Sequence, residues 1–150
     1  MRLKDLNCIV TGGSSGIGAA TVKRFVEEGA QVLIADIDID SANSFADEMG
    51  SSVEAIKCDV RIETDVKAVS DHAYKTWDKV DVLVNNAGSE LNQTYDKTTL
   101  EEWDRVLDTD LKGPWLMCKY IVPGMVNAGS GSVINISSLN GLVGFPLSTA

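Results

Sequence analysis

The sequence has no long hydrophobic run and no start resembling a targeting signal. Nowhere in its 150 residues does an apolar stretch approach the roughly 20 residues that are needed to cross a bilayer. The charged residues between Met1 and Leu6 are not followed by the apolar core of a secretory signal. We therefore expect a cytoplasmic protein that has no membrane partner.

Cysteine is scarce and badly placed for cross-linking. Cys8, Cys58 and Cys118 are odd in number and far apart, and no two of them have the spacing of zinc ligands. This pattern excludes a disulfide framework. It predicts reduced thiols in the interior, as is usual for a cytoplasmic protein, and no metal site.

Positive charge is also in short supply. The chain has 13 Lys and Arg residues against 22 Asp and Glu residues, which gives a net charge of -9. No local cluster of Lys and Arg reverses this balance. Because a negative protein is repelled by phosphate backbones, we expect no nucleic-acid partner.

What the sequence does contain is an alternation of short β-branched runs with longer segments of helical period. Strands are predicted near 6–11, 31–36, 53–58, 80–84 and 131–136, and helices near 16–28, 40–49, 62–77 and 101–127. The strands are mostly apolar, as expected where helices cover both faces of a sheet. The pattern predicts one α/β domain over residues 1–150, with a parallel sheet in a three-layer arrangement.

The last predicted helix has two unusual features. Apolar residues recur along it at steps of three and four, which predicts a packing stripe; they are Leu107, Leu111, Trp115, Cys118, Val122 and Met125. Pro114 lies inside the same segment. Because proline removes a helix hydrogen bond and clashes with the preceding turn, we expect a bend just before it.

A glycine-rich turn joins the first predicted strand to the first predicted helix. It runs from Thr11 to Gly18, and its expected ligand-binding residues are Gly12, Ser14, Ser15, Gly16, Ile17 and Gly18. Glycines let the backbone approach a pyrophosphate, and the N–H groups at a helix N-terminus favour an anion. A purely structural turn is the alternative. A Walker-type phosphate site is excluded because Gly-Lys-Ser/Thr is absent.

An acidic residue ends the second predicted strand. Asp36 stands where a carboxylate can accept hydrogen bonds from the ribose hydroxyls of an adenosine. A 2′-phosphate would meet like charge there, and neither Ser15 nor Ile37 offers a compensating cation. The sequence therefore predicts a doubly wound Rossmann fold that binds NAD rather than NADP, with a solvated loop acid as the alternative for Asp36.

Three motifs, in a fixed order, resemble those of the short-chain dehydrogenase/reductase family. They are Thr-Gly-x-x-x-Gly-x-Gly at 11–18, Asn-Asn-Ala-Gly at 85–88, and Asn-Ile-Ser-Ser at 135–138. The resemblance covers the whole chain. It implies the strand order 3-2-1-4-5 and an NAD-dependent oxidoreductase that exchanges hydride between an alcohol and a ketone or aldehyde.

The resemblance also implies roles for further residues. Asp59 and Val60 would flank the adenine, and Asn85, Asn86, Ala87, Gly88 and Ile136 would complete the cofactor site, together with Ile37 beside Asp36. All of them follow predicted parallel strands, and ligands bind at the carboxyl ends of such strands. Two alternatives remain open: Asn85 acts only in the sheet, and Asp59 only caps the next helix.

The resemblance implies an incomplete catalytic set. Ser138 matches the family's catalytic serine, and Asp110 stands where the family usually has a helix asparagine. An isosteric replacement with little function is the alternative for Asp110. The family's Tyr-x-x-x-Lys pair is not found, because none of Tyr74, Tyr95 and Tyr120 precedes a lysine at the fourth position. The tail 146–150 precedes the place where that tyrosine is expected, so we expect residues 1–150 to be truncated and inactive alone.

The sequence thus predicts a cofactor-binding domain with a small-molecule alcohol or carbonyl substrate. The resemblance further implies a homo-oligomer that assembles through the 101–127 helix. The first alternative is an inert NAD-binding or assembly module. The second is another Rossmann-type enzyme, such as a methyltransferase, which the motifs at 85–88 and 137–138 disfavour.

Overall fold

The core of the protein is a parallel sheet of five strands in the order β3-β2-β1-β4-β5. The computed structural model describes residues 1–148, so Thr149 and Ala150, the end of the tail noted above, lie outside the described residues. The strands are β1 (Asn7–Thr11), β2 (Gln31–Asp36), β3 (Val53–Lys57), β4 (Val82–Asn85) and β5 (Ser132–Asn135). The predicted fold class and strand order are confirmed.

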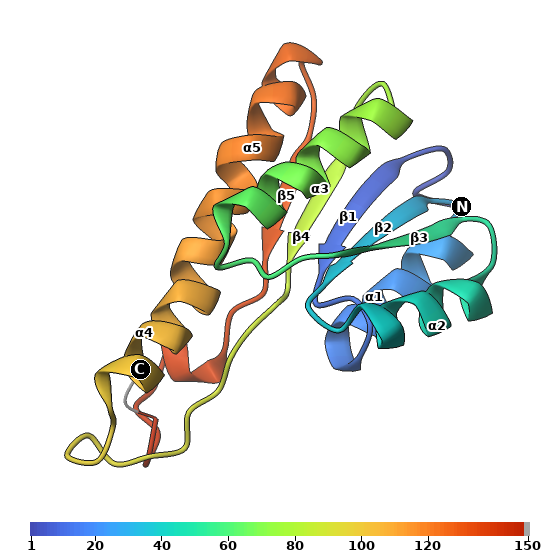
Figure 1. Ribbon diagram of the computed structural model, residues 1–150. Helices are drawn as coiled ribbons and strands as arrows, with labels where there is room; N and C mark the ends of the chain where they lie inside the picture. The colour runs from blue at the N-terminus through green and yellow to red at the C-terminus, as the bar shows by residue number, and fades with distance from the viewer. Residues whose placement is uncertain (149–150) are drawn as a thin grey trace.

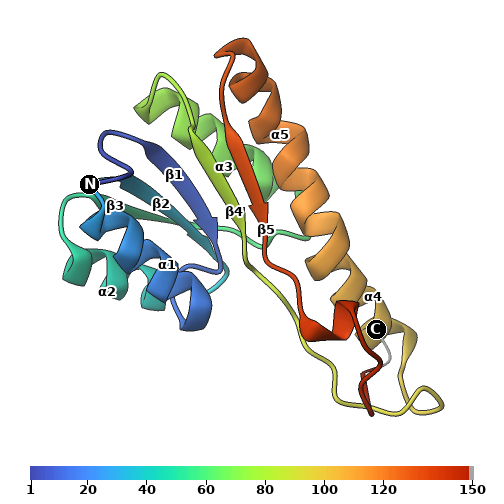
Figure 2. The ribbon, with the colours of Figure 1, turned by 180° about the vertical axis from the view of Figure 1, so that it is seen from behind.

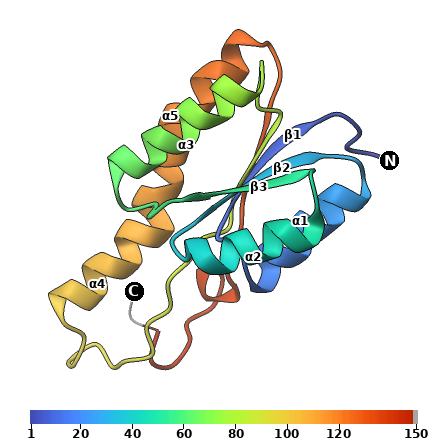
Figure 3. The same ribbon diagram turned by 45° about the vertical axis from the view of Figure 1, so that its right-hand side comes forward.

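Helices cover both faces of this sheet, as Figures 1 and 3 show. On one face α1 (Gly16–Glu27) and α2 (Ile39–Met49) bury Val22, Ala42 and Ala46 against the strands. On the other, α3 (Glu63–Thr76) and α5 (Gly113–Asn127) bury Val66, Met117 and their neighbours. The hydrophobic gain from both faces explains why β1, β2 and β4 are almost wholly buried apolar runs.

The segment predicted as one long helix is built from three pieces. They are α4 (Leu100–Leu107), a π-helical turn η1 (Asp108–Lys112) and α5. In the π turn the Gly113 N–H donates to Asp108 O, five residues back. Pro114 lies in the first turn of α5, directly after the π turn, so the helical hydrogen-bond pattern changes just before it, where a bend was expected. The irregularity precedes it because its nitrogen cannot donate to a carbonyl of the preceding turn.

The start of α5 packs closely against Val60, in the segment that follows β3. A Cβ added to Gly113 would lie 2.8 Å from Val60 Cγ2, so only glycine lets the helix come this near. Farther along, Pro123 lies inside α5. Two hydroxyls of α3 donate to carbonyls of this helix, from Tyr74 to Ile121 O at 2.6 Å and from Ser70 to Tyr120 O at 3.1 Å.

The predicted apolar stripe divides between core and solvent. Met125 is buried, whereas Leu111 and Trp115 are 69% and 58% exposed. The buried side chains of α5 are mainly others, Leu116, Met117 and Ile121. No helix between residues 1 and 148 is long and apolar enough to span a membrane.

The fifth strand differs from the other four. All four residues of β5 are exposed, and β5 lies at the edge of the sheet. Beyond it, the only helix or strand in the described residues up to 148 is a short turn of 3-10 helix, η2 (Leu139–Gly141). Figures 1 and 2 show this segment running away from the sheet beside the chain that follows β4. The two segments meet where Gln93 N–H donates to Leu147 O at 2.8 Å.

Candidate functional site

The glycine-rich turn is held by its neighbours as well as by its own conformation. Gly12 and Gly16 have φ angles of 62° and 53°, a region that favours glycine. A Cβ on Gly18 would press on the Gly12 carbonyl and come within 2.6 Å of Asn86 Nδ2. Glycine is therefore required at these places for the first turn of α1 to fold back on β1.

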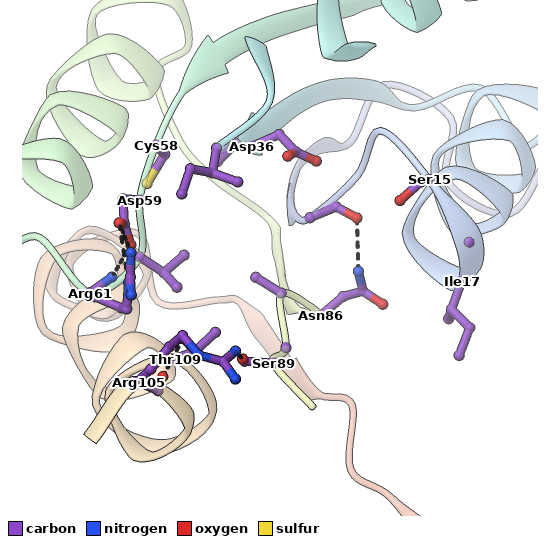
Figure 4. A pocket seen from close by; sticks show the side chains of 17 residues that line it. Ser15, Ile17, Asp36, Cys58, Asp59, Arg61, Asn86, Ser89, Arg105 and Thr109 are labelled. Atoms are coloured by element: carbon purple, nitrogen blue, oxygen red, sulfur yellow. Dashed lines mark hydrogen bonds and ion pairs between the residues drawn. The ribbon is translucent and has the colours of Figure 1, made fainter. Parts of the chain in front are cut away.

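Asp36 connects the end of β2 to this turn. Its carboxylate accepts the Ser14 N–H at 3.0 Å and the Asp38 N–H at 3.1 Å. The residue is buried, and Figure 4 shows its carboxylate turned towards the strand that carries the turn. Two backbone donors thus fix the orientation of a carboxylate at the carboxyl end of the sheet before any ligand binds.

The loop after β4 is tied to the end of β1 by a closed set of hydrogen bonds. Thr11 Oγ1 accepts N–H groups from Asn86 and Ala87, each at 3.0 Å. In return, the Asn86 amide donates to Thr11 O at 3.0 Å and Gly12 O at 2.9 Å. The buried hydroxyl satisfies backbone groups that have no strand partner, and so sets where Asn86, Ala87 and Gly88 lie.

Asp59 lies at the opposite wall and is paired with Arg61. The Asp59 carboxylate accepts hydrogen bonds from Arg61 Nε at 2.9 Å and Nη2 at 2.6 Å. These bonds lower the pKa of the Asp59 carboxyl. Asp59 N–H in turn donates to Asp65 at 3.1 Å. Asp65 therefore holds the backbone after β3, while the carboxylate of Asp59 is directed to Arg61 (Figure 4).

These groups surround a cavity of about 560 Å³ at the carboxyl ends of the strands. It is open to solvent, and its wall is formed by the turn after β1 and the segments after β2, β3 and β4 (Figure 4). Most of the residues expected to bind cofactor line it: Gly12, Ser15, Gly16, Ile17, Asp36, Ile37, Asp59, Val60, Asn86, Ala87 and Gly88. The cavity therefore brings together four segments that the sequence analysis grouped as one site.

Several expected site residues do not line this cavity: Ser14, Gly18, Asn85, Asp110, Ile136 and Ser138. Ser14 contributes its backbone N–H to Asp36, and Gly18 allows the close packing of the turn. Asn85 is buried in β4, where its amide donates to Asn135 Oδ1 of β5 at 2.8 Å. Its own Oδ1 is buried without a hydrogen-bond partner.

The two residues expected to be catalytic do not themselves line the cavity. Ser138 is exposed, and its hydroxyl accepts the Asn140 N–H at 3.2 Å, which caps η2. Ile136 precedes it, and its N–H donates to Asn85 O at 2.9 Å. Asp110 lies in the π turn and accepts the Ser89 N–H at 2.8 Å. Loss of water around its carboxyl raises the pKa of Asp110.

Sequence reasoning missed part of the wall: Ala35, Cys58, Arg61, Ser89, Arg105 and Thr109. Four of these adjoin a residue expected to bind cofactor after a strand, so strand-end position was a usable signal, and Thr109 adjoins Asp110. Arg105 and Thr109 come from the α4 region, and no motif marks them. Cys58 is an inert part of the wall, because burial raises the pKa of its thiol to about 12.

The fold and the cavity together define a Rossmann-type α/β protein. Comparison with known proteins narrows this class, because residues 7–150 match the family model described as short chain dehydrogenase. The chain is 35% identical to the 3-oxoacyl-(acyl-carrier-protein) reductase FabG of Thermotoga maritima, over 97% of this chain and 61% of that protein. It is 38% identical to a 3-alpha-(or 20-beta)-hydroxysteroid dehydrogenase of Mycobacterium bovis, over 95% and 55%.

A plant relative gives the same result. Momilactone A synthase of Oryza sativa is 40% identical over 90% of this chain and 50% of its own length. The chain thus belongs to the short-chain dehydrogenase family, and the family resemblance noted from the motifs is confirmed. It spans between half and about three-fifths of the length of these curated relatives.

Proposed function

We propose that the protein binds NAD(H) in the cavity and, as part of a complete dehydrogenase, transfers hydride between an alcohol and a ketone or aldehyde. The observation that carries this proposal is the buried Asp36 carboxylate, held by Ser14 and Asp38 beside the glycine turn. The cofactor supplies the hydride chemistry. The residues of this chain bind and orient it.

The cavity has the chemical features that a dinucleotide requires. Nothing lies within 4 Å of a Cβ added to Gly16, so the turn faces open space, whereas a Cβ at Gly12 would come within 3.0 Å of Ala87. Backbone N–H groups at the start of α1 would receive the pyrophosphate. Asp36 would accept the ribose hydroxyls, and Asp59 and Val60 would flank the adenine. Asn85 in β4 and Ile136 after β5 do not line the cavity, and they would contribute to the cofactor site from behind its lining residues.

The charges around Asp36 favour NAD over NADP. Ser15 and Ile37, its neighbours in the wall, carry no charge, so neither of them would offset a 2′-phosphate. The wall does include Arg61 and Arg105, but Arg61 is paired with Asp59, and Arg105 binds Ser89 and Glu90. Binding of a second negative group at Asp36 would therefore be opposed by repulsion from its carboxylate.

Catalysis is the conditional part of this proposal. Ser138 would orient the substrate oxygen, and Asp110 would act at the place of the family's asparagine. Residues 1–150 contain no Tyr-x-x-x-Lys pair to move the proton. We therefore propose no turnover by residues 1–150 alone. Reduction of NAD by purified residues 1–150 in the presence of an alcohol would contradict it.

We also propose a cytoplasmic location and assembly of identical copies through the α4 and α5 helices. The side chains that support assembly are Trp103, Leu107, Leu111 and Trp115, each at least 37% exposed. These side chains recur every four residues along one helical segment, and clusters of exposed apolar side chains are characteristic of interaction surfaces. Sedimentation of a monomer at all concentrations would contradict the assembly.

The ribose assignment can be tested with Asp36→Ala and Asp36→Asn. Both variants should weaken NAD binding by roughly tenfold or more, since a hydrogen bond to a charged group contributes about 1.5–3 kcal/mol. Both should also relax discrimination against NADP. Titration calorimetry measures both affinities, with Asp47→Ala, an exposed carboxylate on α2, as the control.

Two results would contradict the assignment. One is unchanged affinity for both dinucleotides in the Asp36 variants. The other is tighter binding of S-adenosylmethionine than of NAD by the unaltered protein, which would instead support a methyltransferase-type site.

A further inference from the structure

At the edge of the cavity, one arginine that no motif predicted connects a helix to the loop after β4. Arg105 projects from α4, and its guanidinium donates from Nη1 to Ser89 Oγ and from Nη2 to Glu90 O, the latter at 3.3 Å. Figure 4 shows the Arg105 and Ser89 side chains in contact beside Thr109. The Arg105 side chain thus joins α4 to the loop after β4, which forms part of the cavity wall.

The loop needs such a support. From residue 86 to residue 99 the chain forms neither helix nor strand, so regular secondary structure does not fix its backbone. Up to Ala87 its position is set by Thr11 Oγ1, which accepts the Asn86 and Ala87 N–H groups. After Gly88 the contacts come from the other side, from Arg105 and from Asp110.

Arg105 and Asp110 hold Ser89 from two directions. Asp110 accepts the Ser89 N–H at 2.8 Å, and Arg105 donates to the Ser89 hydroxyl. The arginine also lies near enough to Asp110 to favour its ionised form, which opposes the effect of burial on the pKa of that carboxyl. Thr109 Oγ1 donates to Arg105 O at 2.7 Å and ties the base of the arginine to the π turn.

We propose that Arg105 is a positioning residue for the cofactor cavity, which fixes the Gly88 to Glu90 backbone against α4 so that the wall is already formed before a ligand enters. The inference rests on the proposed dinucleotide site. It adds that affinity depends on an arginine that acts through the loop.

The test combines two measurements on the protein, one of which needs no cofactor. Without ligand, Arg105→Met should raise the hydrogen-exchange rate of the Ser89 amide by about tenfold or more, measured by NMR, since the loop then opens locally. The exchange of Val22 and Val66, buried in α1 and α3, should not change. With ligand, the same variant should weaken NAD binding by roughly tenfold.

Three further variants separate positioning from a general loss of structure. Arg105→Lys keeps the charge but cannot reach both acceptors, so its NAD affinity should lie between those of the unaltered protein and Arg105→Met. Ser89→Ala, which removes the hydroxyl acceptor, should also be intermediate. Arg24→Met removes an arginine on α1 that is paired with Glu27 and Glu28, and should leave both measurements unchanged.

Three results would overturn the inference, and a fourth would overturn the proposed function. An unchanged Ser89 exchange rate in Arg105→Met would overturn the inference, as would faster exchange with unchanged NAD affinity. Equal losses in Arg105→Lys and Arg105→Met would also overturn it, because rescue is required. If the unaltered protein binds no dinucleotide, the proposed function fails, and so does the role of Arg105 in cofactor binding. The exchange rates would still show whether Arg105 holds the loop.

Discussion

The loops that follow β1 and β2 are supported differently from the segment that follows the edge strand β5. The loops after β1 and β2 are fixed by bonds between segments, with the Asp36 carboxylate holding Ser14 and the Asn86 amide holding Gly12. After β5, by contrast, Ser138 bonds to Asn140 within its own turn, and residues 130–147 are exposed throughout. In the proposed site, the residues that would bind the cofactor are thus held by other segments, whereas Ser138, which would orient the substrate, is held within its own turn.

This difference shows which part of the proposed activity is intrinsic to the described fold. The strand ends in the cavity wall are held by hydrogen bonds from neighbouring segments, such as those of Asp36 and Thr11, and these bonds require no ligand. Ser138 and Ile136 stand on exposed backbone, where local opening costs little free energy. Binding should therefore be robust, and orientation of a substrate by Ser138 should depend on whatever covers β5.

The largest effect is expected where the well-supported end is packed most tightly. Gly18→Ala places a methyl group against the Gly12 carbonyl and near Asn86, so it should reduce the free energy of unfolding by about 3 kcal/mol and abolish NAD binding. Gly144→Ala, where nothing lies within 4 Å of the added Cβ, should change it by less than about 0.5 kcal/mol. Urea denaturation compares the two, and equal changes would remove the contrast.

A pair of neighbours in the sheet sharpens the comparison. Val84 and Ile134 are partners in the β4–β5 register, yet Val84 is 1% exposed and Ile134 is 41% exposed. Val84→Ala should cost about 2 kcal/mol and Ile134→Ala about 1 kcal/mol or less, although the second loses more atoms. Thermal unfolding of both variants measures this. A larger loss for Ile134→Ala would mean that β5 is buried in the protein in solution.

The smallest effect concerns the charge at Asp110. Its folded pKa is raised above the unfolded value, so the stability that it contributes is greatest in acid and falls as pH rises through the interval between the two values. Asp110→Asn should therefore stabilise the protein at neutral pH, by less than about 1 kcal/mol because solvent screens the site.

The pH dependence is the decisive part of that experiment. The advantage of Asp110→Asn should disappear as the pH falls through the same interval, where the unaltered carboxyl becomes protonated. Unfolding midpoints measured across this range should show the trend, and Asp47→Asn on α2 should not. A stabilisation independent of pH would mean that the charge of Asp110 is not its cause.

Much of the fold could be predicted because the period of apolar residues changes clearly between strands and helices. The strand ends near 11, 36 and 58 then placed Gly12, Asp36 and Asp59 at one edge of the sheet, where the structure has them. Arg105 was not predictable in this way. Its role depends on the distance between α4 and the loop after β4, which no local pattern encodes.

The long helix shows the same limit. Its period indicated a helix over 101–127, but the π turn at Asp108–Lys112 depends on how Pro114 and Gly113 are accommodated against Val60. The apolar stripe likewise predicts a packing surface, but its period does not indicate which face of the helix meets the sheet. Leu111 and Trp115 therefore proved exposed, while Met117 and Ile121 fill the core.

The close approach of Gly113 to Val60 has a thermodynamic consequence. Val60 lines the cavity, and Gly113 begins the helix whose outer side carries Trp115. A partner that displaces the start of α5 must therefore displace the cavity wall, because no side chain lies between them to absorb the motion. Linkage is reciprocal, so if assembly changes the affinity for a dinucleotide by some factor, the dinucleotide changes the assembly constant by the same factor.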